Sequence, residues 1–150
     1  MAIMRGNDYI SGKEGSVQGI IQGRVVDLFY IKTFEANVEF KKSEQTPIGS
    51  RFTVHKISGA MGSGSMTISY VTSEFRALAS QYLKTGQYPY ITLIITNEDP
   101  DSSAGKQVVS LYDVSFDSMP FGKLDSEAEV LDEDLDFTFS GLDLTESFSI

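Results

Sequence analysis

The sequence predicts a mainly β fold, an antiparallel β-barrel or β-sandwich of about seven or eight strands flanked by one α-helix. Apolar and polar residues alternate through several short segments, most regularly in residues 31–41, IKTFEANVEFK, and a strand places alternate side chains on opposite faces. Helical periodicity is confined to about residues 73–85. A doubly wound α/β fold needs a helix at nearly every crossover, so the segment pattern excludes that class.

The predicted strands are short and are bounded by turn-forming residues. They are residues 15–21, 24–31, 31–41, 51–57, 65–71, 90–96, 106–116 and 135–142. Pro47 and Gly49 interrupt the alternation after residue 41. The Gly-rich residues 58–65 predict a flexible turn, or a loop kept small so that another backbone can approach. The acidic residues 125–136 predict an edge strand or a tether on the body.

One helix is predicted over about residues 73–85. Its apolar side chains recur at helical spacing: Phe75, Leu78, Ala79, Tyr82 and Leu83. Thr72 or Ser73 suits the N-cap, Gly86 suits the position after the last turn, and Pro89 prevents continuation. Because only one face is apolar, we expect this helix to lie on a sheet.

Length and composition indicate one domain of 150 residues with no cysteine, and hence no disulfide or thiolate site. The net charge of −9 is uneven, with 10 basic and 7 acidic residues in 1–97 but 2 basic and 14 acidic residues in 98–150. No Lys/Arg cluster can replace the counterions of a nucleic acid, so we expect no sequence-specific binding of DNA or RNA. We also expect no secretory signal and no membrane anchor, because no apolar run has the required length.

The sequence offers no candidate for catalysis. His55 is the only histidine, and no motif supplies the nucleophile that a histidine base would need. A single histidine without cysteine does not form a zinc site. Residues 97–108 begin like an EF-hand loop but carry Ser102 and Val108 where glycine and glutamate are required. We therefore expect neither an enzyme nor a protein with a bound cofactor or metal.

Several segments in a fixed order resemble one known family. They are ISGKEG, IKTFEANVEFKKSE, HKISGAMGSGSMT, YVTSEF, VSLYDVSFDS and DSEAEVLDEDLDFTF. Together they resemble the tail tube proteins of contractile phage tails, of the kind found in a defective Bacillus prophage, and of the related R-type bacteriocins. The resemblance runs from about Ile10 to Phe139. It implies a β-barrel or sandwich with one helix, and six-subunit rings that stack into a hollow tube inside a contractile sheath.

This resemblance assigns an expected role to the polar face of the alternating strands. We expect that face to line the channel, where carboxylates and small hydroxyl groups would repel DNA instead of holding it. The candidate lumen-facing residues are Glu35, Asn37, Glu39, Ser65, Thr67 and Ser69. A shift of one residue would swap the faces of any single strand, so the opposite register stays open.

The chain is expected to be a single tail-tube domain over residues 1–150, with an arm at about 42–64 and an acidic C-terminal segment at about 124–150. The arm would contact a neighbouring ring, and an ordinary long hairpin is the alternative. Its candidate contact residues are Glu44, Pro47, Gly49, Arg51, Gly59, Gly62 and Gly64.

The resemblance also implies partners and a location. The expected partners are further copies of the chain, the tail sheath protein, the tape-measure protein and a baseplate component that initiates the tube. The expected location is the virion or bacteriocin particle, after assembly in the bacterial cytoplasm. Phage, defective prophage and headless bacteriocin would use the same tube, and the sequence does not distinguish them.

The alternative function is a β-sandwich binding module, for example for carbohydrate. Such a module needs an exposed aromatic platform or a calcium site. Tyr9, Tyr88 and Tyr90 are the available aromatic residues, but Tyr90 is predicted to lie in a core strand and the chain has no tryptophan. The residue pattern therefore favours the tube subunit.

Overall fold

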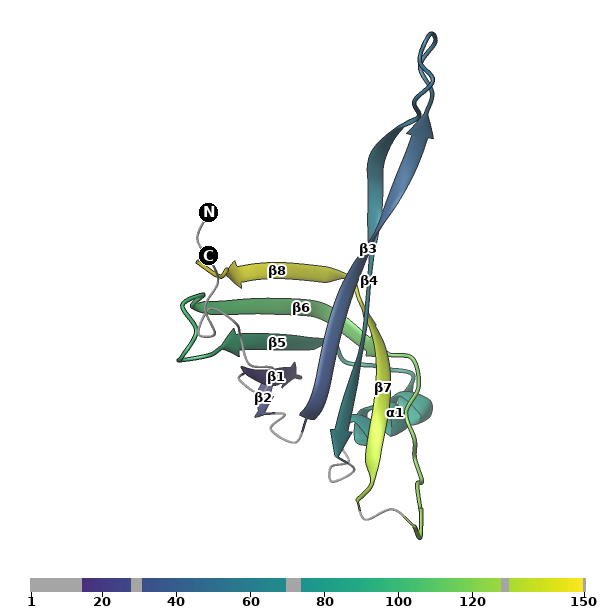
Figure 1. Ribbon diagram of the computed structural model, residues 1–150. Helices are drawn as coiled ribbons and strands as arrows, with labels where there is room; N and C mark the ends of the chain where they lie inside the picture. The colour runs from purple at the N-terminus through teal and green to yellow at the C-terminus, as the bar shows by residue number, and fades with distance from the viewer. Residues whose placement is uncertain (1–14, 28–30, 70–73, 128–129, 150) are drawn as a thin grey trace.

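The computed structural model describes residues 15–27, 31–69, 74–127 and 130–149, and these contain eight strands and one helix (Figure 1). The elements are β1 (Gly15–Ile21), β2 (Arg24–Asp27), β3 (Ile31–Gln45), β4 (Val54–Ser69), α1 (Glu74–Thr85), β5 (Ile91–Glu98), β6 (Lys106–Phe116), β7 (Asp132–Phe139) and β8 (Gly141–Glu146). Every paired strand is antiparallel. The predicted mainly β class with one helix is therefore confirmed.

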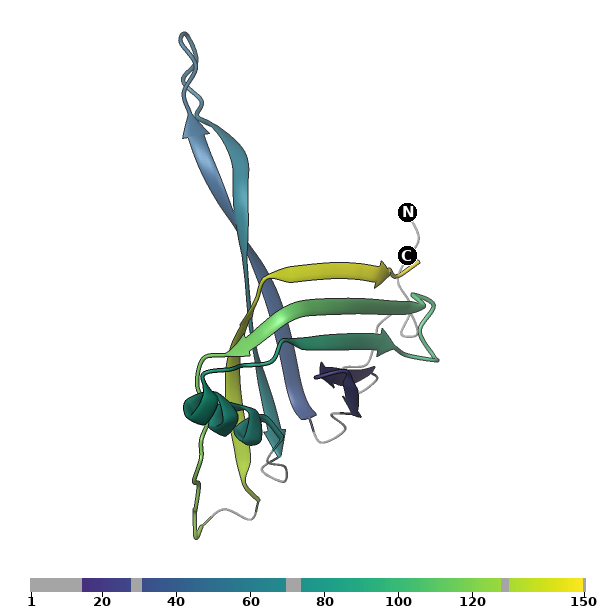
Figure 2. The same cartoon turned by 180° about the vertical axis from the view of Figure 1, so that it is seen from behind.

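The strands form one open sheet that divides into two leaves along β6. The first leaf contains β2, β1, β5, most of β6 and β8, and the second contains the end of β6, β7, β4 and β3. The two leaves run crosswise, with α1 beside the second leaf (Figures 1 and 2). In the described residues the path ends at β2 and β3, so the sheet does not close on itself.

A β-bulge bends β6 where it passes between the leaves. Asp113 has a φ of 55°, and the register of β5 against β6 shifts between Ile91 and Leu93. Such a bulge bends a strand and increases its local twist. The amide of Ser140, between β7 and β8, donates a hydrogen bond of 3.1 Å to the carbonyl of Tyr112. The bend of β6 and the junction of β7 and β8 therefore lie beside each other, and the chain passes from one leaf to the other at both.

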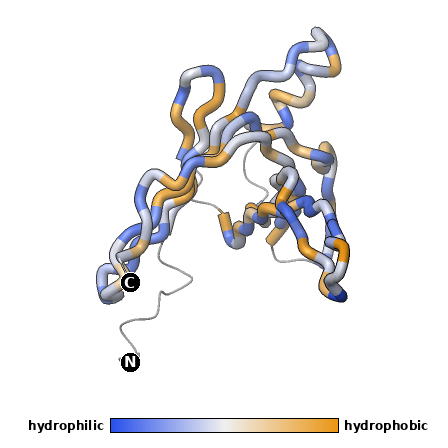
Figure 3. The backbone as a smooth tube through the Cα atoms, turned by 90° about the horizontal axis from the view of Figure 1, so that it is seen from above, coloured by the Kyte–Doolittle hydropathy of each residue, from blue (hydrophilic) through white to orange (hydrophobic). Residues whose placement is uncertain are grey.

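The hydrophobic core lies between the two leaves and is built mainly from alternate residues of β1, β4, β5, β6 and β7. Its fully buried side chains include Ile21, Ile91, Leu93 and Leu111 from the first leaf, and Met66, Ile68, Leu135 and Phe137 from the second. Figure 3 shows polar and apolar residues alternating along the strands. The Phe137 ring lies 5.6 Å from that of Phe34 and 6.2 Å from that of Phe116, centroid to centroid. Aromatic pairs at these distances add to the hydrophobic stabilisation of the core.

The C-terminal end of the helix follows the sequence prediction. Gly86 has a φ of 77°, and its amide donates a hydrogen bond of 2.7 Å to the carbonyl of Tyr82. Glycine adopts this left-handed conformation without a steric penalty, which ends the helix. The predicted N-cap residues, Thr72 and Ser73, lie outside the described residues.

Only the first half of the apolar stripe on α1 is buried. Phe75 and Leu78 belong to the core, and the Phe75 ring lies 4.7 Å from that of Phe116. Tyr82 and Leu83 are 50% and 76% exposed. The expected packing of the helix on the sheet is thus confirmed for its first turns, and the last turn extends past the core.

The prediction of a turn or loop at residues 58–65 is wrong, because these residues lie inside β4. A Cβ atom on Gly62 would lie 2.3 Å from the Phe139 ring, and one on Gly64 would lie 2.5 Å from the Phe137 ring. The two glycines make room for core rings of the adjacent strand. A close approach within a sheet and a flexible turn both favour glycine, so composition alone did not separate them.

One sequence prediction holds for part of its range and another is corrected. Residues 132–136 belong to β7, where they pair with β4 on one side, while the pairing of β7 with β6 involves Phe137 and Thr138. This part of the acidic segment is therefore a strand with a ladder on one side, as the edge-strand prediction expects. Tyr90 precedes β5 and is 79% exposed, so it does not lie in a core strand. Of the predicted strands, residues 28–30, 70 and 71 lie outside the described residues.

Candidate functional site

The outer face of the second leaf, here called the polar face, gathers the predicted lumen-facing residues. Directly paired residues of antiparallel strands share a face, so the register determines which side chains lie together. Three neighbouring rows across β3, β4 and β7 are Thr33–Thr67–Asp134, Glu35–Ser65–Asp136 and Asn37–Ser63–Thr138. Hydroxyl, amide and carboxylate groups therefore cover this face.

Hydrogen bonds and one ion pair connect the strands across the polar face. Thr67 Oγ1 donates to Asp134 Oδ1 at 2.6 Å, and the hydroxyl oxygens of Ser115 and Thr138 lie 3.3 Å apart. At one end, Lys32 Nζ lies 2.8 Å from Asp132 Oδ1, which balances its charge. The three rows themselves carry carboxylates and no basic residue, so the centre of the face is acidic.

All six predicted lumen-facing residues lie on the polar face. Ser69 pairs with Asp132 at the end near α1, and Glu39 pairs with Met61 where β3 and β4 leave the body. Their assignment to a channel stays a prediction. The sequence reading missed Ser63 and the contribution of β7, Asp134, Asp136 and Thr138. Period-two alternation in residues 132–139 carried that signal, but a run of acidic residues also fits a solvated loop.

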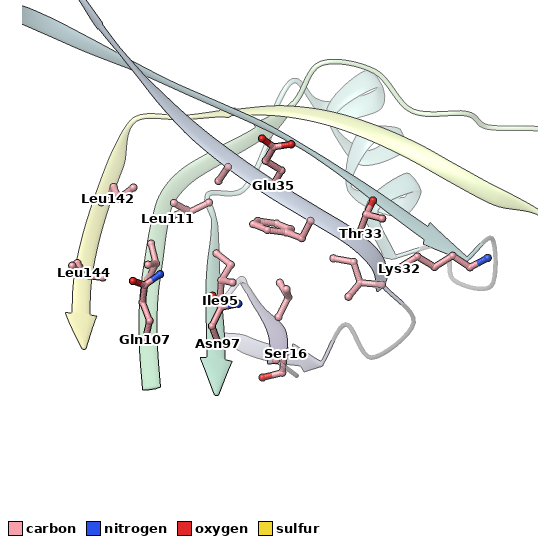
Figure 4. Close-up of a pocket in the computed structure, with 16 residues that line it drawn as sticks. Ser16, Lys32, Thr33, Glu35, Ile95, Asn97, Gln107, Leu111, Leu142 and Leu144 are labelled. Atoms are coloured by element: carbon pink, nitrogen blue, oxygen red, sulfur yellow. The ribbon is translucent and has the colours of Figure 1, made fainter. Parts of the chain in front are cut away.

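The opposite side of β3 faces a hollow of about 780 Å³ between the two leaves, which both apolar and polar residues line. Phe34 and Ala36 of β3 line one side, and Ile95, Leu111 and residues of β8 line the other. Figure 4 shows Thr33 and Glu35 on the same strand pointing away from this hollow. The hollow is open in the single chain, which leaves the inner face of β3 only partly covered.

The open edge of the second leaf is the longest unpaired strand edge in the described residues. β3 has 15 residues and pairs only with β4. An unpaired strand edge presents backbone N–H and C=O groups that can pair with another chain. Soluble proteins usually keep such edges short, bulged or covered, and β3 has irregularities only near Ile31 and Lys41, so its long edge is available for pairing with a further strand.

The outer part of the β3–β4 hairpin, with the end of β3, the turn and the start of β4, projects far beyond the body (Figures 1 and 2). Every residue from 41 to 58 is exposed, and we call this segment the arm. Glu44 and the tip residues Pro47, Gly49 and Arg51 lie in it. Gly59 lies where the arm leaves the body, with open space around the position of a Cβ. The segment is a long hairpin, which both the arm and the ordinary-hairpin alternative expect, and its contact with a neighbouring ring stays a prediction.

Gly62 and Gly64 are placed differently from the other predicted arm contacts. Both lie in the part of β4 that pairs with β7 and both adjoin core phenylalanine rings. This packing explains the two glycines within one chain, and a role in ring contacts is not needed to account for them.

A buried ion pair joins the helix to the polar strand β7. Arg76 Nη1 donates to Glu133 Oε2 at 2.5 Å, and the side chains are 12% and 3% exposed. Burial raises the pKa of Glu133 above its ordinary value, and the nearby Arg76 and Lys123 oppose that shift. Glu133 is on the inner face of β7, so the pair positions α1 on the side of the second leaf away from the polar face.

The described residues show no arrangement typical of a metal site. They contain no group of three or more His, Cys, Asp or Glu side chains that could hold an ion. His55 lies in the arm, where its Nδ1 is 3.8 Å from Glu44 Oε1. Within the same residues, no helix combines the length and the apolarity that crossing a membrane requires.

Comparisons with known proteins identify the family of the chain. The sequence model of a family described as phage tail tube protein matches residues 2–146. The Phage-like element PBSX protein XkdM of Bacillus subtilis (strain 168) is 43% identical over 146 residues, which are 97% of this chain and 97% of that protein. These matches span almost the whole chain.

Solved structures share the fold at low sequence identity. A chain in the cryo-EM structure of the anti-feeding prophage cap, described as the tube-terminating cap, has a TM-score of 0.72 and 8% identity, and the match covers 98% of this chain and 95% of that chain. A chain of the sheath-tube complex of the extracellular contractile injection system PVC has a TM-score of 0.70 and 6% identity, and the match covers 93% of this chain and 92% of that chain. At such identities the likeness establishes the fold alone.

Proposed function

The chain belongs to the phage tail tube protein family and is a structural subunit of a tail tube, and we propose that six copies form a ring whose stacking builds the inner tube of a contractile tail. The observation that carries this proposal is the second leaf, which combines an acidic polar face with a strand edge left open along the 15 residues of β3. The open edge of β3 could pair with the next copy, and the polar faces of the paired copies would then form one continuous surface.

Ring closure in this proposal occurs through the open edge. When β3 of one copy pairs with a strand of the next, its backbone groups are satisfied and the edge is no longer a site for uncontrolled aggregation. The same contact would cover the hollow behind Phe34 and Ala36, including its apolar side chains. Closing a sheet into a cylinder removes its edges altogether.

The polar face would then line the channel of the tube. Carboxylates of Glu35, Asp134 and Asp136 lie on this face among small hydroxyl residues. A phosphate backbone is repelled by such a surface, and the small side chains offer little contact area. The tube would therefore serve as a conduit that DNA crosses without being held, and its work requires no catalysis.

The arm would reach a neighbouring ring, and other components would complete the particle. The PVC structure is named as a sheath-tube complex, and another related structure is named as a baseplate. We extend both relations to this chain, with a sheath around the tube, a baseplate component as initiator and a tape-measure protein within. The proposed location is the phage or bacteriocin particle, after assembly in the bacterial cytoplasm.

Cryo-electron microscopy of concentrated purified protein tests the proposal directly. We expect six-fold rings or tubes in which a backbone ladder crosses from β3 of one copy to the next copy. Nucleation can require the baseplate partner, so the same experiment is repeated with tail lysates that contain it. Tubes whose subunits touch only through loops would contradict the proposal, as would a carbohydrate-binding monomer that never assembles in either sample.

The arm is tested by shortening its tip. Removing residues 46–53 and closing β3 to β4 with two residues leaves the core of the body unchanged, because every residue in the arm is exposed. We expect folded protein that forms rings but no stacked tubes. A deletion of residues 59–64 is less useful, since it also removes the glycines packed under the core rings. Normal tubes from the tip deletion would exclude the arm as an inter-ring contact.

A further inference from the structure

The described molecule has two projecting segments at opposite ends of its long direction. The arm extends from one end, and the connection from β6 to β7 extends from the other (Figure 1). We call residues 117–127 of this connection the basal loop. Its last residues, 121–127, are all exposed. When copies are placed end to end in the same orientation, the arm of one copy approaches the basal loop of the next.

The arm carries a positive net charge and exposed apolar side chains. It contains four basic residues, Lys41, Lys42, Arg51 and Lys56, and one acidic residue, Glu44. At its tip, Ile48 and Phe52 are 106% and 83% exposed. Apolar side chains that are exposed this fully gain most when another surface covers them.

The basal loop has the opposite charge and its own exposed apolar side chains. It contains Asp117, Asp125 and Glu127 and a single basic residue, Lys123. Lys123 donates from Nζ to the carbonyl of Asp132, so its charge is turned toward its own body. The amide of Glu127 donates to Asp125 Oδ1 at 3.0 Å. Leu124, which directly precedes Asp125, is 97% exposed, and Phe121 is 55% exposed.

From this complementarity we infer that the basal loop of one copy is the surface that receives the arm of a second copy. Arg51 and Lys56 would meet Asp125 and Glu127, and the tip residues Ile48 and Phe52 would cover Leu124. The inference rests on the proposed stacking of rings and names the partner surface of the arm, which the proposed function leaves open. Complementary charges at such a contact fix its partner and its register.

The geometry of this contact is head to tail. The arm and the basal loop are different surfaces at opposite ends, so each copy that binds one neighbour leaves the other surface free. A heterologous contact of this kind extends without closing. A contact that extends without closing can build a stacked tube. A two-fold contact closes at a dimer and cannot.

Cysteine cross-linking tests the contact, because the native chain has no cysteine and gives no background. Ser50→Cys in the arm tip is combined with Ser126→Cys in the basal loop, and the assembled protein is oxidised. We expect a ladder of dimers, trimers and higher species on a denaturing gel. The matched control combines Ser50→Cys with Ser147→Cys near the end of β8, which is also exposed, and should remain monomeric.

The outcomes separate this inference from the proposed function. Tubes that are visible by electron microscopy but do not cross-link through Ser126→Cys would overturn the basal loop as the partner and leave ring stacking intact. A ladder from the control pair but not from the test pair would overturn it as well. If no stacked tubes form from wild-type protein with its initiator, the stacking proposal fails and this inference fails with it.

Charge reversal gives a second and independent readout. Arg51→Glu with Lys56→Glu should raise the protein concentration needed for half-maximal tube formation by about tenfold or more, because like charges then meet. Adding Asp125→Lys and Glu127→Lys should restore assembly to within about threefold of wild type if the pairs couple. Lys84→Glu with Lys106→Glu is the control of equal charge. Equal losses in control and test variants, or no restoration, would contradict the contact.

Discussion

Two glycines of β4 are required by the size of the rings that pack over them. A Cβ on Gly64 would lie 2.5 Å from both the Phe137 ring and the carbonyl oxygen of Glu35. The carbonyl belongs to the backbone and cannot rotate away, so the strands would have to separate. Gly59 of the same strand has nothing within 4 Å of that position. The effect of a glycine-to-alanine substitution on stability therefore depends on where the glycine lies in the sheet.

Gly64→Ala is expected to lower the free energy of unfolding by about 1–3 kcal/mol, because it overpacks the core. Gly59→Ala is the matched control and should leave stability within about 1 kcal/mol of wild type, since alanine loses less backbone entropy than glycine. Urea unfolding followed by circular dichroism measures both. Equal destabilisation by the two substitutions would contradict the packing explanation.

Glu133 makes the stability of the subunit depend on pH. Burial raises its pKa above the ordinary 4.5, despite the opposing charges of Arg76 and Lys123. An acid with a raised pKa holds its proton more tightly in the folded chain than in the unfolded chain. Its contribution to stability is therefore complete below pH 4.5 and is lost as the pH rises through the folded pKa.

We expect the difference in unfolding free energy between wild type and Glu133→Gln to fall as the pH rises from below 4.5 through the folded pKa, and then to become constant. Subtracting the variant removes the titration of the other carboxylates, which both proteins share. Urea unfolding at a series of pH values between about 4 and 7 measures the difference. A difference that increases over this range would show that attraction to Arg76 outweighs the cost of burial.

At the scale of the element, periodicity predicted the strands with one buried face and the helix. Residues 31–41 alternate, and the structure places Glu35 and Asn37 on one face and Phe34 and Ala36 on the other. The acidic residues before Phe137 gave no sign of a split between the two faces, because three of four charged side chains in 132–136 lie on the polar face while Glu133 is buried against Arg76. A single sequence does not indicate a partner 57 residues away.

The division of the sheet into two leaves was also hidden from sequence analysis. It depends on the bulge at Asp113, where one residue adopts a φ of 55° within a continuous strand pattern. Aspartate tolerates this conformation, but it is equally common in ordinary strand ends and turns. The pattern therefore predicted β6 from residue 106 to 116 correctly and gave no sign that the strand serves both leaves.

The bend of β6 leads to a prediction for Asp113. Asp113→Val should destabilise the protein by about 1–2 kcal/mol, because a β-branched side chain clashes with the backbone at positive φ. Asp113→Gly should be tolerated, since glycine adopts this conformation freely. Thermal unfolding of both variants compares them directly. A valine variant as stable as the glycine variant would mean that the bend does not depend on the conformation of this residue.

At the scale of the whole molecule, the uneven charge has two opposing effects on assembly. A net charge of −9 makes identical copies repel one another. The basic arm and the acidic basal loop attract locally, and salt weakens both effects together. Salt dependence alone therefore does not identify the contact. Arg51→Glu with Lys56→Glu and its control, Lys84→Glu with Lys106→Glu, change the net charge by the same amount, so a difference between them reports the local contact.

The polar face gives the last prediction, which concerns the assembled tube. Replacing Glu35 and Glu39 by lysine changes two exposed side chains on that face and no core contact. We expect tubes to form as in wild type, because neither residue packs in the core. Each ring of six copies would then carry 12 new positive charges toward the channel, and Lys side chains bind the phosphate backbone in a salt-dependent manner.

DNA passage is the quantity that this change should alter. In a phage that carries Glu35→Lys and Glu39→Lys, ejection should be slowed at low salt and should recover as salt rises, because the new contacts are electrostatic. The matched control is Asp143→Lys with Glu146→Lys on β8, which adds the same charge to exposed positions of the first leaf. Ejection is measured by the release of dye-labelled DNA.

If the control slows ejection as much as the test variant, charge anywhere on the subunit matters and the polar face has no special role. If ejection from the test variant is normal in intact tubes, the polar face does not line the channel, and the ring must expose a different face of the sheet to DNA.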